Sequence, residues 1–210
     1  EDTRLGLDTP EGRRAAEVIQ ELASSGAVGP ALSSMTETTS LNMFQDEATS
    51  GFMLNWLYVY AAMKENDLSF FDDIGWTTYP RVDADKEAAP PFGGIELGVN
   101  TASQHKDEAW QAISCITSAE HQKEYMLGTG NAASRSSVFD DPQIQEQFPM
   151  ADVFRESLNN AVQRPRTAYY GDLSTAVQRT WSPPEQVDPS RTPAESTELI
   201  MKVLRGEALL

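Results

Sequence analysis

Residues 92–100, Phe-Gly-Gly-Ile-Glu-Leu-Gly-Val-Asn, alternate between apolar positions and positions that are small or polar. In a β-strand, Ile95, Leu97 and Val99 would point to one face and Glu96 with its glycine neighbours to the other. Stretches with helical periodicity stand on both sides of this segment. A strand placed between helices favours an α/β fold built in layers.

The remaining sequence divides into further expected elements. Apolar runs that end at turn residues predict two more strands, at residues 50–56 and 74–80. Capping residues and apolar positions at helical spacing predict helices at 10–25, 38–46, from 57 onward, 107–117, 118–128, 142–148, 151–162, 173–181 and 193–204. In the first helix, we expect Ala15, Val18, Ile19 and Leu22 to form the apolar face.

Charge and hydropathy exclude several classes of function. The 210 residues carry 32 acidic and 16 basic side chains, a net charge of -16. Such a field repels phosphate backbones, so nucleic acid is not expected as a partner. The apolar runs are too short for a membrane-spanning helix. Cys115 is the one cysteine, which excludes an intrachain disulfide, and its place in an amphipathic stretch predicts a buried thiol.

The usual signatures of catalysis and metal binding are missing. His105 and His121 are the two histidines, and their spacing does not suit a metal site, so neither a metal nor a cofactor is expected. Residues 128–133 match a phosphate-binding glycine pattern. That pattern requires a strand before it and a helix after it, whereas here a helix precedes, so a helix end followed by a turn is the prediction.

Two segments have side chains suited to sugars. Asn55, Trp56 and Tyr58 combine an amide with flat rings at a predicted strand-to-helix junction, and Glu96 projects from a strand face flanked by glycines. Aromatic rings stack on the apolar faces of sugars, and amides and carboxylates bond the hydroxyl groups. An aromatic stripe also occurs in protein cores, and Glu96 also suits a plain salt bridge.

Four stretches carry a family resemblance: residues 7–26, 55–60, 92–126 and 164–178. They resemble landmarks of the extracellular sugar-binding proteins of ABC importers, the group that contains maltose- and trehalose/maltose-binding proteins. Within it the chain looks most like the trehalose-binding lipoproteins of actinobacterial importers. The resemblance implies a type II periplasmic-binding-protein fold with two α/β lobes, of which this chain is the C-terminal half. Residues 1–90 and 138–210 would belong to the second lobe and 91–137 to the first.

The same resemblance implies the binding residues. The pocket positions fall on three groups, each named by its number in this sequence: Asn55, Trp56 and Tyr58; Gly93, Gly94, Ile95 and Glu96; and Arg164. The rings would stack on a glucose unit, the glycines would let backbone groups approach hydroxyls, and the charged groups would add strong hydrogen bonds.

The implied function is that of a non-enzymatic receptor. It would bind a disaccharide, trehalose or a related α-glucoside, and deliver it to transmembrane permease subunits that work with cytosolic ATPase subunits. The expected location is the extracytoplasmic face of the plasma membrane, with a lipid anchor on an N-terminal part that precedes Glu1. Two alternatives stay open: a glycosidase or glycosyltransferase that uses Glu96, and a helical module that docks a basic protein.

Overall fold

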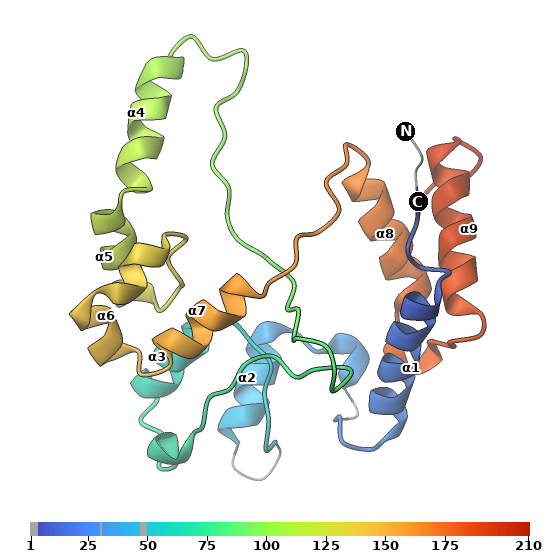
Figure 1. Cartoon of the computed structure of the whole chain (residues 1–210), viewed down its shortest axis with the longest axis horizontal. Coiled ribbons are helices and arrows are strands. Elements are labelled where there is room, and N and C mark those ends of the chain that lie inside the picture. Colours follow the sequence, from blue (N-terminus) through green and yellow to red (C-terminus); the bar gives the residue numbers. More distant parts are fainter. Residues whose placement is uncertain (1–3, 30, 47–49) are drawn as a thin grey trace. The chain divides into compact units, whose positions relative to one another are not determined.

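The computed structural model describes residues 4–29, 31–46 and 50–210, and helices dominate it (Figure 1). The α-helices are α1 (Pro10–Ser24), α2 (Glu37–Gln45), α3 (Tyr58–Glu65), α4 (Lys106–Ile116), α5 (Ala119–Thr129), α6 (Pro142–Gln147), α7 (Ala151–Asn159), α8 (Tyr170–Trp181) and α9 (Thr192–Leu204). Short 3₁₀ turns are η1 (Leu32–Ser34), η2 (Phe71–Asp73), η3 (Ser136–Asp140) and η4 (Pro184–Gln186). The predicted helices are confirmed with ends shifted by a few residues.

The chain forms two compact units. One, the terminal unit, combines residues 1–36 with 165–210, and the other, the central unit, covers residues 37–164. Every residue that the sequence analysis assigned to a binding site lies in the central unit. None of the helices among the described residues is long and apolar enough to cross a membrane.

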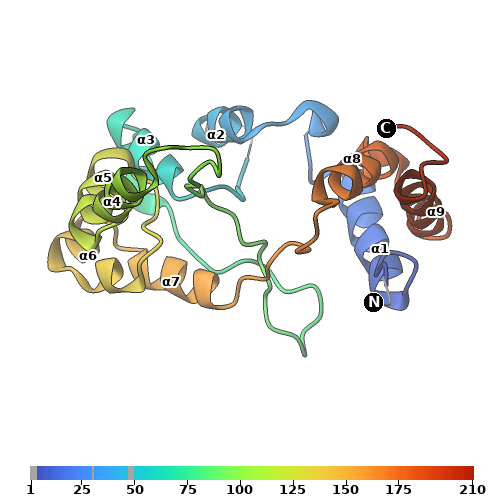
Figure 2. The ribbon, with the colours of Figure 1, turned by 90° about the horizontal axis from the view of Figure 1, so that it is seen from above.

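The terminal unit is a bundle of α1, α8 and α9, with α9 packed against the other two (Figure 2). Helix α1 starts as the sequence predicts: the Thr9 hydroxyl accepts a hydrogen bond from the Gly12 N–H, and Pro10 occupies the first turn. The expected apolar face is wrong in part. Ala16 is fully buried, whereas Leu22 is 52 % exposed, because the face in contact with its neighbours is turned one residue along the helix from the predicted one.

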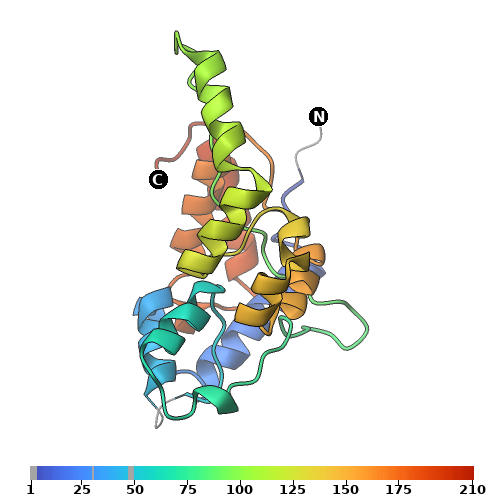
Figure 3. The same ribbon diagram turned by 90° about the vertical axis from the view of Figure 1, so that its left-hand side faces the viewer.

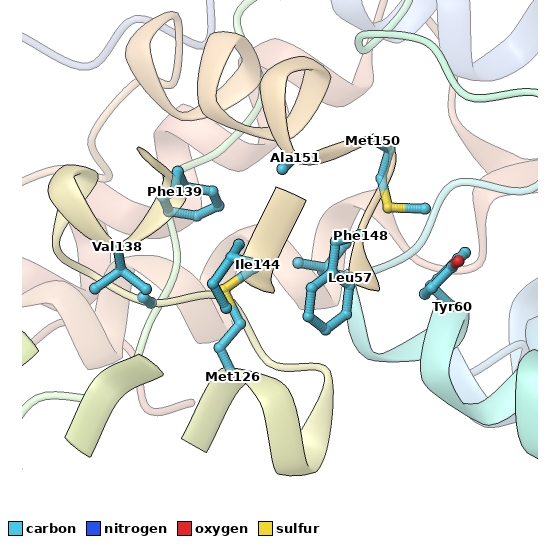
Figure 4. Close-up of a cluster of buried hydrophobic side chains, with 10 residues drawn as sticks. Leu57, Tyr60, Met126, Val138, Phe139, Ile144, Phe148, Met150 and Ala151 are labelled. Carbon is cyan, nitrogen blue, oxygen red and sulfur yellow. The ribbon is translucent and has the colours of Figure 1, made fainter. Parts of the chain in front are cut away.

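The main core of the central unit gathers side chains from α3, α5, α6 and α7 and the turns that join them. Phe148 and Ile144 are fully buried at its centre (Figure 4). The ring of Tyr60 lies 5.8 Å from that of Phe148 and 5.5 Å from that of Trp76, which is half-buried against this core. Burial raises the pKa of the Tyr60 hydroxyl, and the charge of Asp72 raises it further.

A second, smaller core joins α2 to α3. Leu41 from α2 packs with Val59 and Met63 from α3, and Met63 is fully buried. Leu41 is buried, and Phe44, three residues later on α2, packs against the same cluster. Helix α3 therefore has apolar contacts on two sides, which fix the position of its first turn.

The three predicted strands are not formed among the described residues. The described segments contain a single isolated parallel bridge, between Pro91 and Val162, and residues 50–56, 74–80 and 92–100 have no ladder of partners. A strand exists only where a neighbouring segment satisfies its backbone groups, and alternation of side chains supplies no such neighbour. The apolar face of residues 92–100 is exposed as a result, with Ile95 88 % accessible.

Helix α4 carries the second correction. It projects away from α6 and α7 (Figure 3), and none of its residues is buried. Cys115, predicted to be a core thiol, is exposed. The amphipathic pattern formed the helix as expected, but the His121 ring of α5, 3.7 Å from the Cys115 Sγ, does not cover the thiol, which stays exposed.

Helix α5 ends at Thr129, one residue later than the sequence predicts. Gly128 is inside the helix, and Gly130 is the capping glycine, with a left-handed φ of 74°. The Gly130 N–H donates to the Met126 carbonyl. A Cβ on Gly130 would stand 2.8 Å from the Ala61 Cβ of α3, so glycine also permits α5 to approach α3. The predicted helix end within residues 128–133 is confirmed, and residues 131–133 follow it without regular structure.

These two glycines should respond to alanine in opposite directions. Gly130→Ala should lower the free energy of unfolding by about 1–2 kcal/mol from the left-handed backbone, and the clash with Ala61 adds to this loss. Gly128→Ala, with open space around it, should raise that free energy by about 0.5–1 kcal/mol. Urea denaturation followed by circular dichroism measures both, and a shift of the same sign in the two variants would contradict the assigned helix end.

Candidate functional site

Trp56 lies at the junction where an extended segment enters α3. Its side chain is 45 % exposed, while Leu57 next to it is buried in the main core. The backbone is thus anchored directly beside a ring that solvent reaches. An anchored, exposed aromatic ring is the arrangement that stacking on a ligand requires.

The Trp56 ring meets the segment that contains Gly93. A Cβ placed on Gly93 would lie 3.1 Å from Cη2 and 3.6 Å from Cζ3 of the indole. The structure therefore brings together two residues that the sequence analysis assigned to one pocket, although 37 positions separate them in the numbering. Gly93 is half-buried at this contact.

Tyr58 lies in the first turn of α3 and is half-buried. Its side chain packs against the smaller core, and its backbone faces Gly130. A Cβ added to Gly130 would lie 3.3 Å from the Tyr58 Cα. Of the two predicted stacking rings, Trp56 is the more accessible, and Tyr58 is partly used in packing.

Arg164 reaches the same neighbourhood through the backbone. The Phe92 N–H donates to the Val162 carbonyl at 2.8 Å, and the Val162 N–H donates to the Pro90 carbonyl at 2.9 Å. In this parallel register, Gly93 and Arg164 each stand two residues beyond the paired position. Arg164 is exposed and has no hydrogen-bond or ion-pair partner among the described residues.

Gly94, Ile95 and Glu96 continue the same extended segment and are all exposed. No side-chain contact with Trp56 or Arg164 is found for them in the part of the chain that the structure describes. Space around Gly94 is open, because a Cβ there would meet nothing within 4 Å. These three residues thus follow the Trp56–Gly93 contact directly along the chain, and the side chains of Ile95 and Glu96 are exposed to solvent.

Metal-ligating clusters and hollows are the other kinds of place where a ligand could bind. Within 4–29, 31–46 and 50–210, no group of three or more His, Cys, Asp or Glu side chains is arranged to hold a metal ion. Two open hollows of about 350 and 490 Å³ lie beside α3, one next to Gln143 of α6 and the other next to Asp72 of η2. None of the predicted binding residues lines either hollow.

The model of the family described as "Bacterial extracellular solute-binding protein" matches residues 1–151 of the chain. The chain belongs to this family. A relative, the "Probable ABC transporter-binding protein" of Deinococcus radiodurans, is 27 % identical over 176 residues, which is 82 % of this chain and 41 % of the relative.

Two solved structures share the fold of this solute-binding chain. The maltose-bound MalE3 of T. maritima superposes with a TM-score of 0.82 at 23 % identity and is covered over 53 % of its length by 97 % of this chain. The maltose-maltodextrin binding protein of Alicyclobacillus acidocaldarius gives a TM-score of 0.73 at 22 % identity, with coverage of 52 % and 95 %. The expected α/β type II periplasmic-binding fold is confirmed, and the chain spans about half the length of these proteins.

The assignment of residues to lobes stays a prediction, as does the view that the chain is a C-terminal half. The contacts group residues 1–36 with 165–210, whereas the expected lobes divide at 90 and 137. The parallel bridge pairs Pro91 with Val162, so the predicted boundary near residue 90 lies beside Val162, and not beside the predicted boundary at residue 137.

Sequence reasoning missed two features of the site. It treated Asn55 as a free amide, whereas that amide already bonds the Glu37 carbonyl and the Trp56 N–H. It also missed Gly130, which lets α5 approach the first turn of α3. The glycine after Thr129 was a usable signal, since a C-terminal glycine one residue past the helix is the common arrangement.

Proposed function

We propose that this chain recognises a disaccharide, trehalose or a related α-glucoside, as part of the substrate-binding subunit of an ABC sugar importer. One observation carries the proposal: an exposed Trp56 ring lies against a glycine segment in a chain of the solute-binding family. The relative from Deinococcus radiodurans is named as an ABC transporter-binding protein, and MalE3 of T. maritima was solved with maltose.

The proposed chemistry divides between stacking and hydrogen bonding. Trp56 stacks on one glucose ring, and Tyr58 contributes its accessible edge. Backbone groups at Gly93, Gly94 and Ile95 and the carboxylate of Glu96 bond hydroxyls, because these four residues have no hydrogen-bond partner among the described residues and all but Gly93 are exposed. Arg164, which has no partner among the described residues, supplies a charge-assisted bond.

In this proposal the sugar is released chemically unaltered, and its binding free energy drives a change in conformation. Sugar between two lobes favours the closed arrangement, because only there do both lobes touch it, and transmembrane permease subunits respond to that closure. The protein works at the extracytoplasmic face of the membrane, held by a lipid anchor. Residues 92–100 pair as a strand with sequence that the relatives possess and this chain does not span.

Isothermal titration calorimetry of the protein made from its full reading frame tests the proposal. Trehalose and maltose are titrated separately, with glucose as the matched control that offers one ring in place of two. We expect one disaccharide to bind in the micromolar range, a free energy of about -8 kcal/mol, and glucose to bind far more weakly. If neither disaccharide gave a measurable heat of binding at millimolar concentration, the proposal would be wrong.

Chromatography of the same mixtures after overnight incubation separates a receptor from an enzyme. We expect the disaccharide to be recovered intact. Released glucose that disappears in a Glu96→Gln variant would instead identify a glycosidase.

A further inference from the structure

We propose that Asn55 and Gly93 are positioning residues that hold the Trp56 indole from two sides, and that Asn55 affects sugar binding through this ring rather than by touching the sugar. This inference rests on the proposed function, in which Trp56 is the stacking surface. It concerns how the ring is presented before any sugar arrives.

The hydrogen-bonding capacity of the Asn55 amide is nearly filled by its own surroundings. Its Nδ2 donates to the Glu37 carbonyl at 2.9 Å and lies 3.6 Å from the Met53 sulfur, and its Oδ1 accepts from the Trp56 N–H at 2.8 Å. An amide has two N–H donors and one oxygen with two lone pairs. Only one lone pair is left, so Asn55 has no free donor for a sugar hydroxyl oxygen.

These bonds fix the backbone at the base of the ring. The Glu37 carbonyl belongs to the first residue of α2, and the smaller core already packs α2 against α3. The half-buried Asn55 amide thus ties the Trp56 backbone to a helix that begins 18 positions before Asn55. The loop that carries the ring has little freedom left.

Gly93 limits the ring at its opposite end. The two indole atoms within 4 Å of a Gly93 Cβ, Cη2 and Cζ3, are neighbours on the outer rim of the six-membered ring. The contact is therefore at the rim and leaves the faces accessible, in agreement with the 45 % exposure of the side chain. A side chain larger than hydrogen at position 93 would push the rim and rotate the ring.

A ring held at its base and at its rim keeps its faces open but loses rotational freedom. Ordering a side chain when a ligand binds costs affinity, so a ring that is already ordered binds more tightly. Asn55 and Gly93 would share this role although neither depends on a direct bond to the sugar through its side chain.

Fluorine NMR of protein labelled with 5-fluorotryptophan tests the inference on the full-length protein without sugar. Each tryptophan gives its own resonance, those of this chain being Trp56, Trp76, Trp110 and Trp181, and Trp56→Phe identifies the one from Trp56. We expect Asn55→Ala and Gly93→Ala each to move the Trp56 resonance by more than its linewidth and to leave the other tryptophan resonances in place. Trehalose affinity should fall about threefold to tenfold in each variant, as expected when one side chain must be ordered on binding.

Two matched variants control for the substitutions themselves. Asn66→Ala removes an amide at the other end of α3, where it bonds Gln45, and Gly98→Ala adds a Cβ to the same extended segment in open space. Neither should move the Trp56 resonance. Asn55→Asp keeps an oxygen for the Trp56 N–H but cannot donate to Glu37, so its resonance should lie between those of wild type and Asn55→Ala.

An unmoved Trp56 resonance in Asn55→Ala and Gly93→Ala would overturn the inference. If affinity then fell in Asn55→Ala alone, Asn55 would be a direct sugar contact. A moved resonance in a protein that binds neither trehalose nor maltose would leave the positioning role standing and remove the proposed function.

Discussion

Replacing Trp56 by alanine is expected to weaken disaccharide binding about 30-fold or more, which corresponds to the roughly 2 kcal/mol that marks an interface hot spot. The ring is 45 % exposed, and the residue after it is buried in the main core. The substitution therefore removes a contact surface from an anchored backbone. Calorimetric titration of wild type and Trp56→Ala with the same sugar measures the loss.

Trp110→Ala provides the matched control. Its side chain is 55 % exposed on α4, so it is comparable to Trp56 in size and accessibility, but it lies outside the predicted pocket. We expect its sugar affinity to equal that of wild type. Trp56→Phe, which keeps a smaller ring, should lose less affinity than Trp56→Ala. Equal losses in the variants at 56 and 110 would mean that stacking at Trp56 is not the source of binding.

The second large effect concerns stability. Phe148→Ala should lower the free energy of unfolding of the central unit by about 3–5 kcal/mol, the range for removing a large aromatic side chain from a core. Phe148 is fully buried and its ring lies 5.8 Å from that of Tyr60. Because α3, α6 and α7 meet around it, the cavity would be surrounded by elements that cannot easily close it (Figure 4).

Phe52→Ala makes the same chemical change at a side chain that is 94 % exposed. Its unfolding midpoint in urea should stay within the error of the wild-type value, since little apolar surface is removed from contact with the protein. A large shift at Phe52, or a small one at Phe148, would show that the core is not where the structure places it.

Local signals predicted the helices well because the causes of a helix are local. Thr9 and Pro10 at the start of α1 are a cap and a first-turn proline, and both have that role in the structure. Ser118 likewise caps α5, where its hydroxyl accepts from the His121 N–H. Apolar faces were harder to predict, since α1 has apolar residues at neighbouring angles and only packing decides that Ala16 is buried while Leu22 is exposed.

Strands and buried faces could not be predicted from the same signals. Alternation in residues 92–100 shows what a strand could bury, but its hydrogen bonds come from a partner elsewhere in sequence. The prediction of a buried Cys115 thiol was wrong for the same reason: its helix forms, but none of the residues of that helix is buried and the thiol is exposed.

For the candidate site, the family resemblance grouped residues that the periodicity of the sequence does not connect. Nothing in spacing links Trp56 to Gly93, yet the structure brings the indole rim to that glycine. The engagement of the Asn55 amide with Glu37 was beyond the sequence, because it depends on where α2 begins relative to α3. Residue types therefore indicated the chemistry, and tertiary contacts decided which groups remain available for it.

The isolated bridge between Pro91 and Val162 has a mechanical consequence. Two backbone hydrogen bonds join two chain segments at one point, and no neighbouring pair among the described residues extends them into a ladder. Because both bonds link the same two segments, any movement that pulls residues 90–92 away from Val162 would break the two bonds together.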